Sequence, residues 1–349
     1  MTSINSLTVA NPTRAVSLDF PGYLTTRESK FSKHMTAGVP DYAFSMDLAL
    51  RQKLSTLPPV RAFARALTAS VVPMKKQEMQ MTGVAVGPRQ FPDIYDMAEK
   101  CGRTLGIAVP QIFIVQDPQM NAYTMATDDS APMVVVHSSL VHTMNPQELL
   151  FVIGHECGHI HNFHSTYNTM AVILSMPTES LMRAALGSVP GFNLAMMAAQ
   201  KSFQMFLSHW SRCAEVTADR AGMICCGDLR TGQTALAKLA TGGFGLDNVN
   251  IDELLKQIEQ TQQSPARFNE LMMDHPLIPK RIDALRRFAN CDVLFDWHPE
   301  MRGTGKPETH KDVDDAVASY INVFSKGYHS PATGDTFSEN AEDGAKNGL

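Results

Sequence analysis

The chain has 349 residues, of which 44% are apolar and 19% are charged, a composition that is typical of a folded globular protein and excludes an intrinsically disordered one. This length is enough for one well-buried core with appendages. The net charge is −5, and lysine and arginine are scattered, so we expect no binding to nucleic acid and no electrostatic attraction to anionic lipid.

Six cysteines occur without a CxxC pair, which favours reduced, mostly buried thiols in a cytoplasmic protein over a disulfide framework. The N-terminal segment lacks a basic region followed by an apolar run, so no secretory signal is expected. No apolar stretch reaches the roughly 18 residues of a spanning helix. The most apolar region, 170–205, is interrupted by glycine, proline and asparagine. We expect core or interface helix there, with peripheral membrane contact as the alternative.

The first half of the chain predicts three helices and a small set of strands. Residues 1–40 are polar and aperiodic and are expected to form a loosely packed arm. Helical patterns follow over 41–57, which ends at a proline pair, and over 60–72. Pro92 suits the first turn of a helix over 93–105, with Gly106 as its C-terminal cap. Short strands are predicted over 111–116, 121–125 and 133–137, with a turn over 127–132.

Asn145, Pro146 and Glu148 predict a capped helix start, because an asparagine cap and a glutamate three residues later satisfy each other's backbone N–H groups. Beyond this helix the chain is predicted to be almost entirely helical. The helices are expected near 178–188, 194–225, 230–240, 250–262 and 277–289. Pro299 is expected to end the compact part, and the tail from about 326 is expected to be disordered.

Residues 155–159 read HECGH, an HExxH motif inside the capped helix. Helical residues four apart lie about 40° from each other around the axis. His155 and His159 can therefore present two imidazoles to one metal ion. Glu156 projects beside that ion, where a general base is needed. The alternative is an incidental pair of surface histidines.

Three neighbouring side chains do not suit the same metal, since Cys157, His161 and His164 fall on the far side of a regular helix. A catalytic zinc ion needs a third protein ligand. The best candidate is Glu215, with Asp219 four residues further on the same helix face. One of these carboxylates can bind the metal while the other accepts the free N–H of a ligating histidine. An ordinary solvated helix face is the alternative.

An HExxH helix followed by a separate helix with ExxxD resembles the gluzincin pattern of zinc peptidases. The finer motifs are similar to those of the CAAX prenyl endopeptidases and HtpX-type heat-shock peptidases. They are GHECGH at 154–159, EVTADRAG at 215–222, a hairpin pattern with Asn121, Ala122, Tyr123, 134–136 and Leu140, and His275-Pro276 with Arg281, Ile282 and Leu285. The resemblance spans about residues 92–289.

The resemblance implies an α+β, mainly helical fold of the zincin type, with a small sheet packed on the HExxH helix. It implies that His155, His159 and Glu215 hold one Zn²⁺ per chain, with Glu156 as the general base. Asp219 would be the acceptor that orients a ligand histidine. The chain would then hydrolyse peptide bonds as a zinc-dependent endopeptidase acting on peptide or protein substrates.

Four further residues take roles from the resemblance alone. Asn121 and Ala122 would lie on an edge strand that pairs with an extended substrate peptide. His275 would stabilise the oxyanion, and Arg281 would assist it. The alternative for His275 and Arg281 is structural, as a helix cap and a salt bridge.

The resemblance divides the chain into an arm with helices of unknown role at 1–90, a peptidase domain at 91–300 and an extension at 301–349. Family members commonly have membrane-spanning helices before the third ligand, whereas this chain has the interrupted apolar region. A cytoplasmic enzyme without a spanning helix is therefore expected. Two alternatives remain, namely a catalytically silent scaffold or chaperone that retains the peptidase fold, and a latent peptidase inhibited by its own termini.

Overall fold

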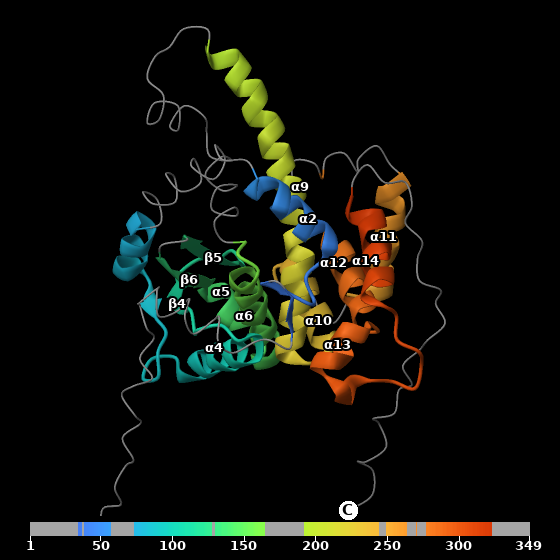
Figure 1. The fold of residues 1–349 in the computed structure, drawn as a ribbon. Helices are drawn as coiled ribbons and strands as arrows, with labels where there is room; N and C mark the ends of the chain where they lie inside the picture. The colour runs from blue at the N-terminus through green and yellow to red at the C-terminus, as the bar shows by residue number, and fades with distance from the viewer. Residues whose placement is uncertain are drawn as a thin grey trace, which may run out of the picture.

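The computed structural model describes residues 34–36, 38–56, 73–127, 130–164, 192–243, 249–263, 270 and 277–322. Figure 1 shows a small sheet on one side of a central helix pair and the C-terminal helices on the other side. The fold is α+β and mainly helical, as predicted. Helix α6 (Pro146–His161) and helix α9 (Phe192–Cys226) form the central pair.

The sheet has four strands in the order β3-β4-β6-β5. They are β3 (Val84–Ala85), β4 (Gln111–Val115), β5 (Ala122–Thr127) and β6 (Ser130–His137). Strands β4 and β6 run parallel, and the other two pairs are antiparallel. Strand β5 continues to Thr127 and strand β6 begins at Ser130, so both strands reach into the span predicted as a turn over 127–132. Strand β5 lies at the edge of the sheet, directly against α6.

The side chains of β4 and β6 alternate between the two faces of the sheet, and both faces are buried. Ile112 and Val134 belong to the main core with α6, whereas Phe113 and Val135 belong to a smaller cluster on the opposite face. Successive strand side chains point to opposite faces, so a run of apolar residues in each strand fills both sides.

The starts and ends of the two best-predicted helices follow their local sequence. Helix α4 (Pro92–Leu105) begins with its proline, and Gly106 ends it in the left-handed conformation with φ of 72°. At α6, the Asn145 side chain accepts bonds from the N–H groups of Gln147 and Glu148, and the Glu148 carboxylate accepts from Asn145 N at 2.8 Å. The capping box predicted there is confirmed.

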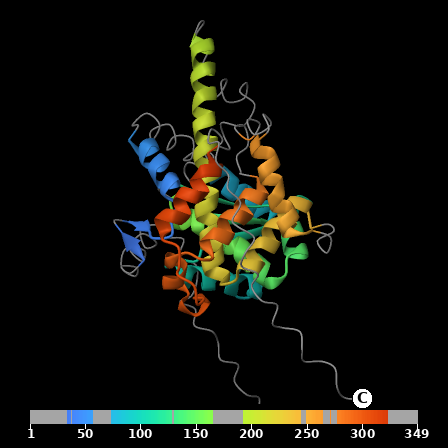
Figure 2. The same ribbon diagram turned by 90° about the vertical axis from the view of Figure 1, so that its right-hand side faces the viewer.

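The predicted C-terminal helices are α9, α10 (Leu229–Thr241), α11 (Ile251–Gln263) and α12 (Ile278–Phe288). The first half of α9 extends beyond the body of the molecule in both views (Figure 1 and Figure 2). The patterns over 60–72 and 178–188 and the tail beyond 322 lie outside the described residues. Within the described part of the chain, no helix is long and apolar enough to cross a bilayer.

The prediction that Pro299 ends the compact part is wrong. Pro299 starts a short turn, η4 (Pro299–Met301), and helix α14 (His310–Ile321) then packs against α2 (Ser45–Ser55) and α12. Val313, Val317 and Tyr320 of α14 are fully buried in the main core. Their spacing of three and four residues marks an amphipathic helix. Two short helices, α5 (Ser138–Thr143) and α13 (Asp292–Trp297), also had no counterpart among the predicted elements.

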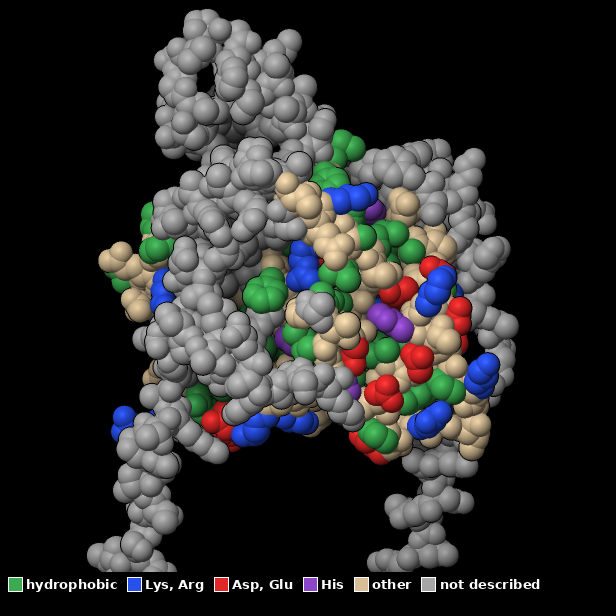
Figure 3. All heavy atoms as spheres, viewed as in Figure 1, with side chains coloured by type: hydrophobic (Ala, Val, Ile, Leu, Met, Phe, Trp, Pro, Cys, Tyr) green, Lys and Arg blue, Asp and Glu red, His purple; other side chains and the backbone are tan. Residues whose placement is uncertain are grey.

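The N-terminal segment is anchored in the same core. It forms a small hairpin, β1 (Met35–Thr36) with β2 (Val39–Pro40), and then helix α2 (Ser45–Ser55), within the helix predicted over 41–57. Tyr42, Phe44 and Leu54 have no exposed side-chain surface and pack in the main core. On the face in Figure 3, acidic and basic side chains intermingle over the C-terminal helices.

Candidate metal centre

Two glycines let α6 and α9 cross at unusually close range. A Cβ atom added at Gly158 would lie 2.6 Å from the Ala221 Cβ, and one added at Gly154 would lie 2.7 Å from the Cys225 Cβ. Real Cβ atoms do not approach so closely, so only glycine fits at these positions. The crossing brings the HExxH face of α6 against the Glu215 face of α9.

Three side chains converge at this crossing. Ligand atoms of His155, His159 and Glu215 all lie within 4.8 Å of one another. The two Nε2 atoms are 3.2 Å apart, and the Glu215 oxygens lie 3.3 Å from His159 Nε2 and 3.6 Å from His155 Nε2. Atoms that bind one tetrahedral zinc ion at about 2.0–2.1 Å are separated by about 3.3–3.4 Å. The donor set and its spacing therefore fit Zn²⁺.

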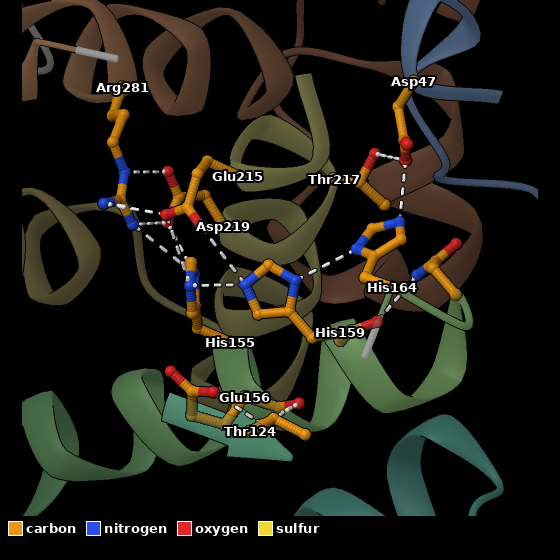
Figure 4. A network of polar contacts seen from close by, with 12 residues as sticks. Asp47, Thr124, His155, Glu156, His159, His164, Glu215, Thr217, Asp219 and Arg281 are labelled. Atoms are coloured by element: carbon orange, nitrogen blue, oxygen red, sulfur yellow. Dashed lines mark hydrogen bonds and ion pairs between the residues drawn. The ribbon is translucent and has the colours of Figure 1, made fainter. Parts of the chain in front are cut away.

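Asp219 and Arg281 surround the first imidazole. Asp219 Oδ1 lies 2.9 Å from His155 Nδ1, on the side of the ring opposite to Nε2. Arg281 donates to Asp219 Oδ2 from Nε at 2.8 Å and to Oδ1 from Nη2 at 2.7 Å, and its Nη1 lies 3.0 Å from Glu215 Oε2. Figure 4 shows this arrangement to one side of the two histidines.

The carboxylates give the site a negative potential. Burial disfavours charge on His155, but the charge of Glu215 and the hydrogen bond that His155 donates to Asp219 outweigh it and raise the pKa of His155. Burial also disfavours charge on Asp219, but the Arg281 guanidinium outweighs it and holds the pKa of Asp219 below its usual value. This potential favours a cation between the imidazoles.

Glu156 lies next to the three donors and contacts strand β5. Its Oε2 accepts a hydrogen bond of 2.6 Å from the hydroxyl of Thr124, and both residues are buried. The sheet is thus joined to α6 at the residue that was predicted to be the general base (Figure 4).

The family model for peptidase family M48 matches residues 88–289. The chain belongs to peptidase family M48. Among its relatives, the plastoglobule-localized metallopeptidase 48 of Arabidopsis thaliana is 31% identical over 222 residues, which cover 62% of this chain and 60% of that protein. A protease HtpX homolog of Pyrococcus abyssi is 28% identical over 231 residues, covering 58% of this chain and 76% of that protein.

The crystal structure of Ste24p from S. mikatae is similar with a TM-score of 0.43 and 18% identity, covering 69% of this chain and 61% of that one. The family match confirms the resemblance to HtpX-type peptidases that the motifs indicated. This chain spans about 60% of the length of its plastoglobule relative.

The remaining predicted residues of this M48 family member lie in different surroundings. Ala122 begins the edge strand β5, and Asn121 precedes it. Arg281 is buried and engaged by two carboxylates. His275 lies outside the described residues.

The observed surroundings of His164 differ from the predicted ones. The prediction assumed a regular helix through position 164, but α6 ends at His161. The chain then turns back, and His164 Nδ1 lies 3.0 Å from His159 Nδ1. It thus contacts the side of the His159 ring that faces away from His155 and Glu215.

Two polar residues near the site could not be identified from the sequence. Thr124 lies within a predicted strand, where threonine is common. Asp47 lies on α2, and its Oδ2 is 2.9 Å from His164 Nε2 across 117 residues of sequence. Neither residue has a motif spacing relative to HExxH that could have identified it.

Proposed function

We propose that this M48 family member is a zinc-dependent endopeptidase that holds one Zn²⁺ through His155, His159 and Glu215. The observation that carries the proposal is the convergence of these three donors at spacings that suit tetrahedral zinc, with Glu156 beside them. The full donor set and the general base are present in one chain. This favours a working peptidase over a silent scaffold.

Bound zinc would supply a Lewis acid that polarises a peptide carbonyl and lowers the pKa of water from about 15.7 towards about 7. Glu156 takes the proton from the attacking water and passes it to the leaving amine. Asp219 accepts the N–H of His155 and keeps its Nε2 available to the metal. We assign stabilisation of the oxyanion to His275.

The contacts of Arg281 support the structural alternative over a role at the oxyanion. Its Nε and Nη2 are directed at Asp219, and its Nη1 is directed at Glu215. A guanidinium held in this way fixes the two acidic residues of α9. We therefore propose Arg281 as a positioning residue.

Substrate binding is proposed at the edge of β5 that does not pair with β6. In the described sheet this strand pairs with β6 alone, so its other edge is available to an extended peptide. Asn121 and Ala122 would contact such a peptide next to Glu156. Peptides and proteins are the proposed substrates.

The cysteines support a reducing compartment such as the cytoplasm. All six are free thiols, five buried and one, Cys226, intermediate. Unpaired cysteines in this number are typical of proteins kept reduced. This agrees with the thiol state predicted from the sequence.

Cleavage of casein and of a peptide library by the full chain tests the proposal. The zinc-loaded protein is expected to cleave both, and removal of zinc with a chelator is expected to abolish cleavage until zinc is restored. Glu156→Gln is the matched variant, because it keeps the shape of the side chain and loses the base. It is expected to retain zinc and lose about 10²–10⁴-fold in turnover. Undiminished hydrolysis by this variant would refute the role of Glu156.

A further inference from the structure

We infer that His164 and Asp47 are positioning residues of the metal centre, which hold the proton of His159 on Nδ1 and so leave Nε2 as its metal-binding atom. The inference rests on the zinc site proposed above and extends it to helix α2. This helix lies outside the region matched by the family model, residues 88–289.

The turn at the C-terminal end of α6 places His164 next to His159. Phe163 adopts the left-handed conformation with φ of 57°. Phe163 N donates to Ile160 O at 3.2 Å, and His164 N donates to His159 O at 2.9 Å. These two bonds form a Schellman motif, in which glycine is usual at the position of Phe163. The left-handed conformation of Phe163 turns the chain back, so that His164 packs against the end of α6.

Two hydrogen bonds connect the ligand histidine to α2. His159 Nδ1 lies 3.0 Å from His164 Nδ1, and His164 Nε2 lies 2.9 Å from Asp47 Oδ2 (Figure 4). His164 has no exposed surface, and Asp47 is 2% exposed. Both hydrogen bonds are therefore shielded from solvent in the core.

The donors around Asp47 fix the direction of both bonds. Its Oδ1 accepts from Trp210 Nε1 at 2.9 Å, and its Oδ2 accepts from the Thr217 hydroxyl at 2.7 Å. The Thr217 oxygen already accepts from Phe44 N at 3.1 Å, which directs its hydrogen to Asp47. A carboxylate in such surroundings is an acceptor only. Therefore His164 Nε2 carries a hydrogen and donates it to Asp47.

The tautomer of His164 in turn fixes the direction of its hydrogen bond with His159. A neutral imidazole with a hydrogen on Nε2 has an acceptor at Nδ1, so His164 accepts the hydrogen of His159 Nδ1. The two Nδ1 atoms lie 3.0 Å apart and share one hydrogen, which His159 keeps when its Nε2 binds the metal. His159 Nε2 is left with its lone pair directed at Glu215 and His155. The partner of a ligand histidine sets its tautomer in this way.

Further contacts hold α2 against the end of α6. The Tyr42 hydroxyl lies 2.9 Å from His161 Nδ1 and accepts from Asn162 Nδ2 at 3.0 Å. Arg51 Nη1 donates to the Asn162 carbonyl oxygen. The N-terminal segment therefore covers the same helix end that carries His164.

Asp47→Asn tests the inference with almost no change in shape. Trp210 only donates, so the new amide oxygen has to face Trp210 and the amide N–H groups have to face His164. His164 Nε2 then accepts, Nδ1 carries the hydrogen, and His159 is driven to the tautomer with hydrogen on Nε2. We expect the zinc dissociation constant, from chelator competition, to rise about 10–100-fold. The visible spectrum of the Co²⁺-loaded protein should change.

A second substitution reverses the effect. Trp210→Phe removes the donor that orients the amide, so the double variant lets the amide oxygen turn to His164. We expect Asp47→Asn with Trp210→Phe to bind zinc more tightly than Asp47→Asn alone. A role of Asp47 in packing alone predicts the opposite, because two losses would add.

His164 is tested by a matched pair. His164→Leu removes the acceptor for His159 Nδ1 and is expected to weaken zinc binding by about 10–100-fold. His164→Asn retains an amide oxygen that can accept near the same place and should restore most of the affinity. Leu54→Ala on α2 is the control for lost packing, since it should lower the unfolding temperature of the zinc-free protein and leave the zinc dissociation constant unchanged.

The outcomes separate this inference from the proposed function. If the unaltered protein binds zinc and cleaves peptides but Asp47→Asn and His164→Leu bind zinc as tightly, the inference is overturned and the proposed function stands. Equal loss in His164→Leu and His164→Asn also overturns it. If the unaltered protein binds no zinc, both proposals fall.

Discussion

Gly158 of α6 lies so close to Ala221 of α9 that a Cβ at position 158 would come within 2.6 Å of the Ala221 Cβ. The same Cβ would lie 3.1 Å from the Cα of Ala218. Gly158 immediately precedes His159, and Ala218 immediately precedes Asp219. The contact that brings the helices together therefore lies in the same segments that carry His159 and Asp219.

Gly158→Ala is expected to push the helices apart and to move Glu215 away from the histidines. Overpacking of this kind costs about 1–3 kcal/mol of stability. Urea unfolding of the zinc-free protein should show this loss, and chelator competition should show weaker zinc binding. Gly87→Ala is the control, because nothing lies within 4 Å of a Cβ at that position. Unchanged zinc affinity in Gly158→Ala would contradict the importance of the close crossing.

Arg281→Met is expected to destabilise the zinc-free protein by about 3–5 kcal/mol, since it leaves two buried carboxylates without their countercharge. Both carboxylates, Asp219 and Glu215, are at most 2% exposed. Arg286 on the same helix pairs with Asp252 at 3.1 Å near the surface, and its side chain is 38% exposed. Arg286→Met should therefore cost less than about 1 kcal/mol. Similar losses in the two variants, measured by chemical unfolding, would contradict the structural role of Arg281.

Thr124→Val is expected to lower kcat while zinc content stays unchanged. It removes the hydroxyl that donates to Glu156 Oε2 at 2.6 Å, and a hydrogen bond to a charged group contributes about 1.5–3 kcal/mol. If that contribution orients the base, kcat should fall about 10-fold or more. Thr124→Ser keeps the hydroxyl and should retain most of the activity. Equal kcat values for the valine and serine variants would show that the bond has no part in catalysis.

Cys226 and Cys291 of the native protein are expected to resist alkylation at neutral pH. Burial raises the pKa of Cys226 to about 11 and that of Cys291 to about 12. A thiol with a pKa of 11 is about one part in ten thousand thiolate at pH 7, and the thiolate is the reactive form. Labelling of Cys226 should therefore increase about tenfold for each pH unit up to about 11.

Mass spectrometry of iodoacetamide-treated protein measures this labelling. Unfolding in guanidinium should make all six thiols reactive. Cys226→Ser should remove the slow labelling of the native protein, since Cys226 is the thiol that is not fully buried. Rapid modification of several cysteines in the folded protein at pH 7 would disagree with the packing described for them.

Local spacing in the sequence was enough to predict the parts of the site that lie on one helix. Residues four apart share a helix face, so HExxH by itself placed His155 beside His159, and the asparagine cap fixed where that helix begins. The same periodicity located the helix with Glu215 and Asp219. Pro92 and Gly106 likewise predicted the ends of α4, because their effect on the backbone is local.

Tertiary structure alone decided which side chains surround that helix. No pattern in the sequence relates Asp47 to His164 across 117 residues, or Thr124 to Glu156 across 32 residues. The helix-based argument even placed His164 away from the site, because it could not show that α6 ends at His161 and turns at a left-handed Phe163. Contacts between elements depend on how closely they pack, as at Gly158 and Ala221, and on where the chain turns. Both are properties of the folded chain and not of a residue's spacing from its neighbours.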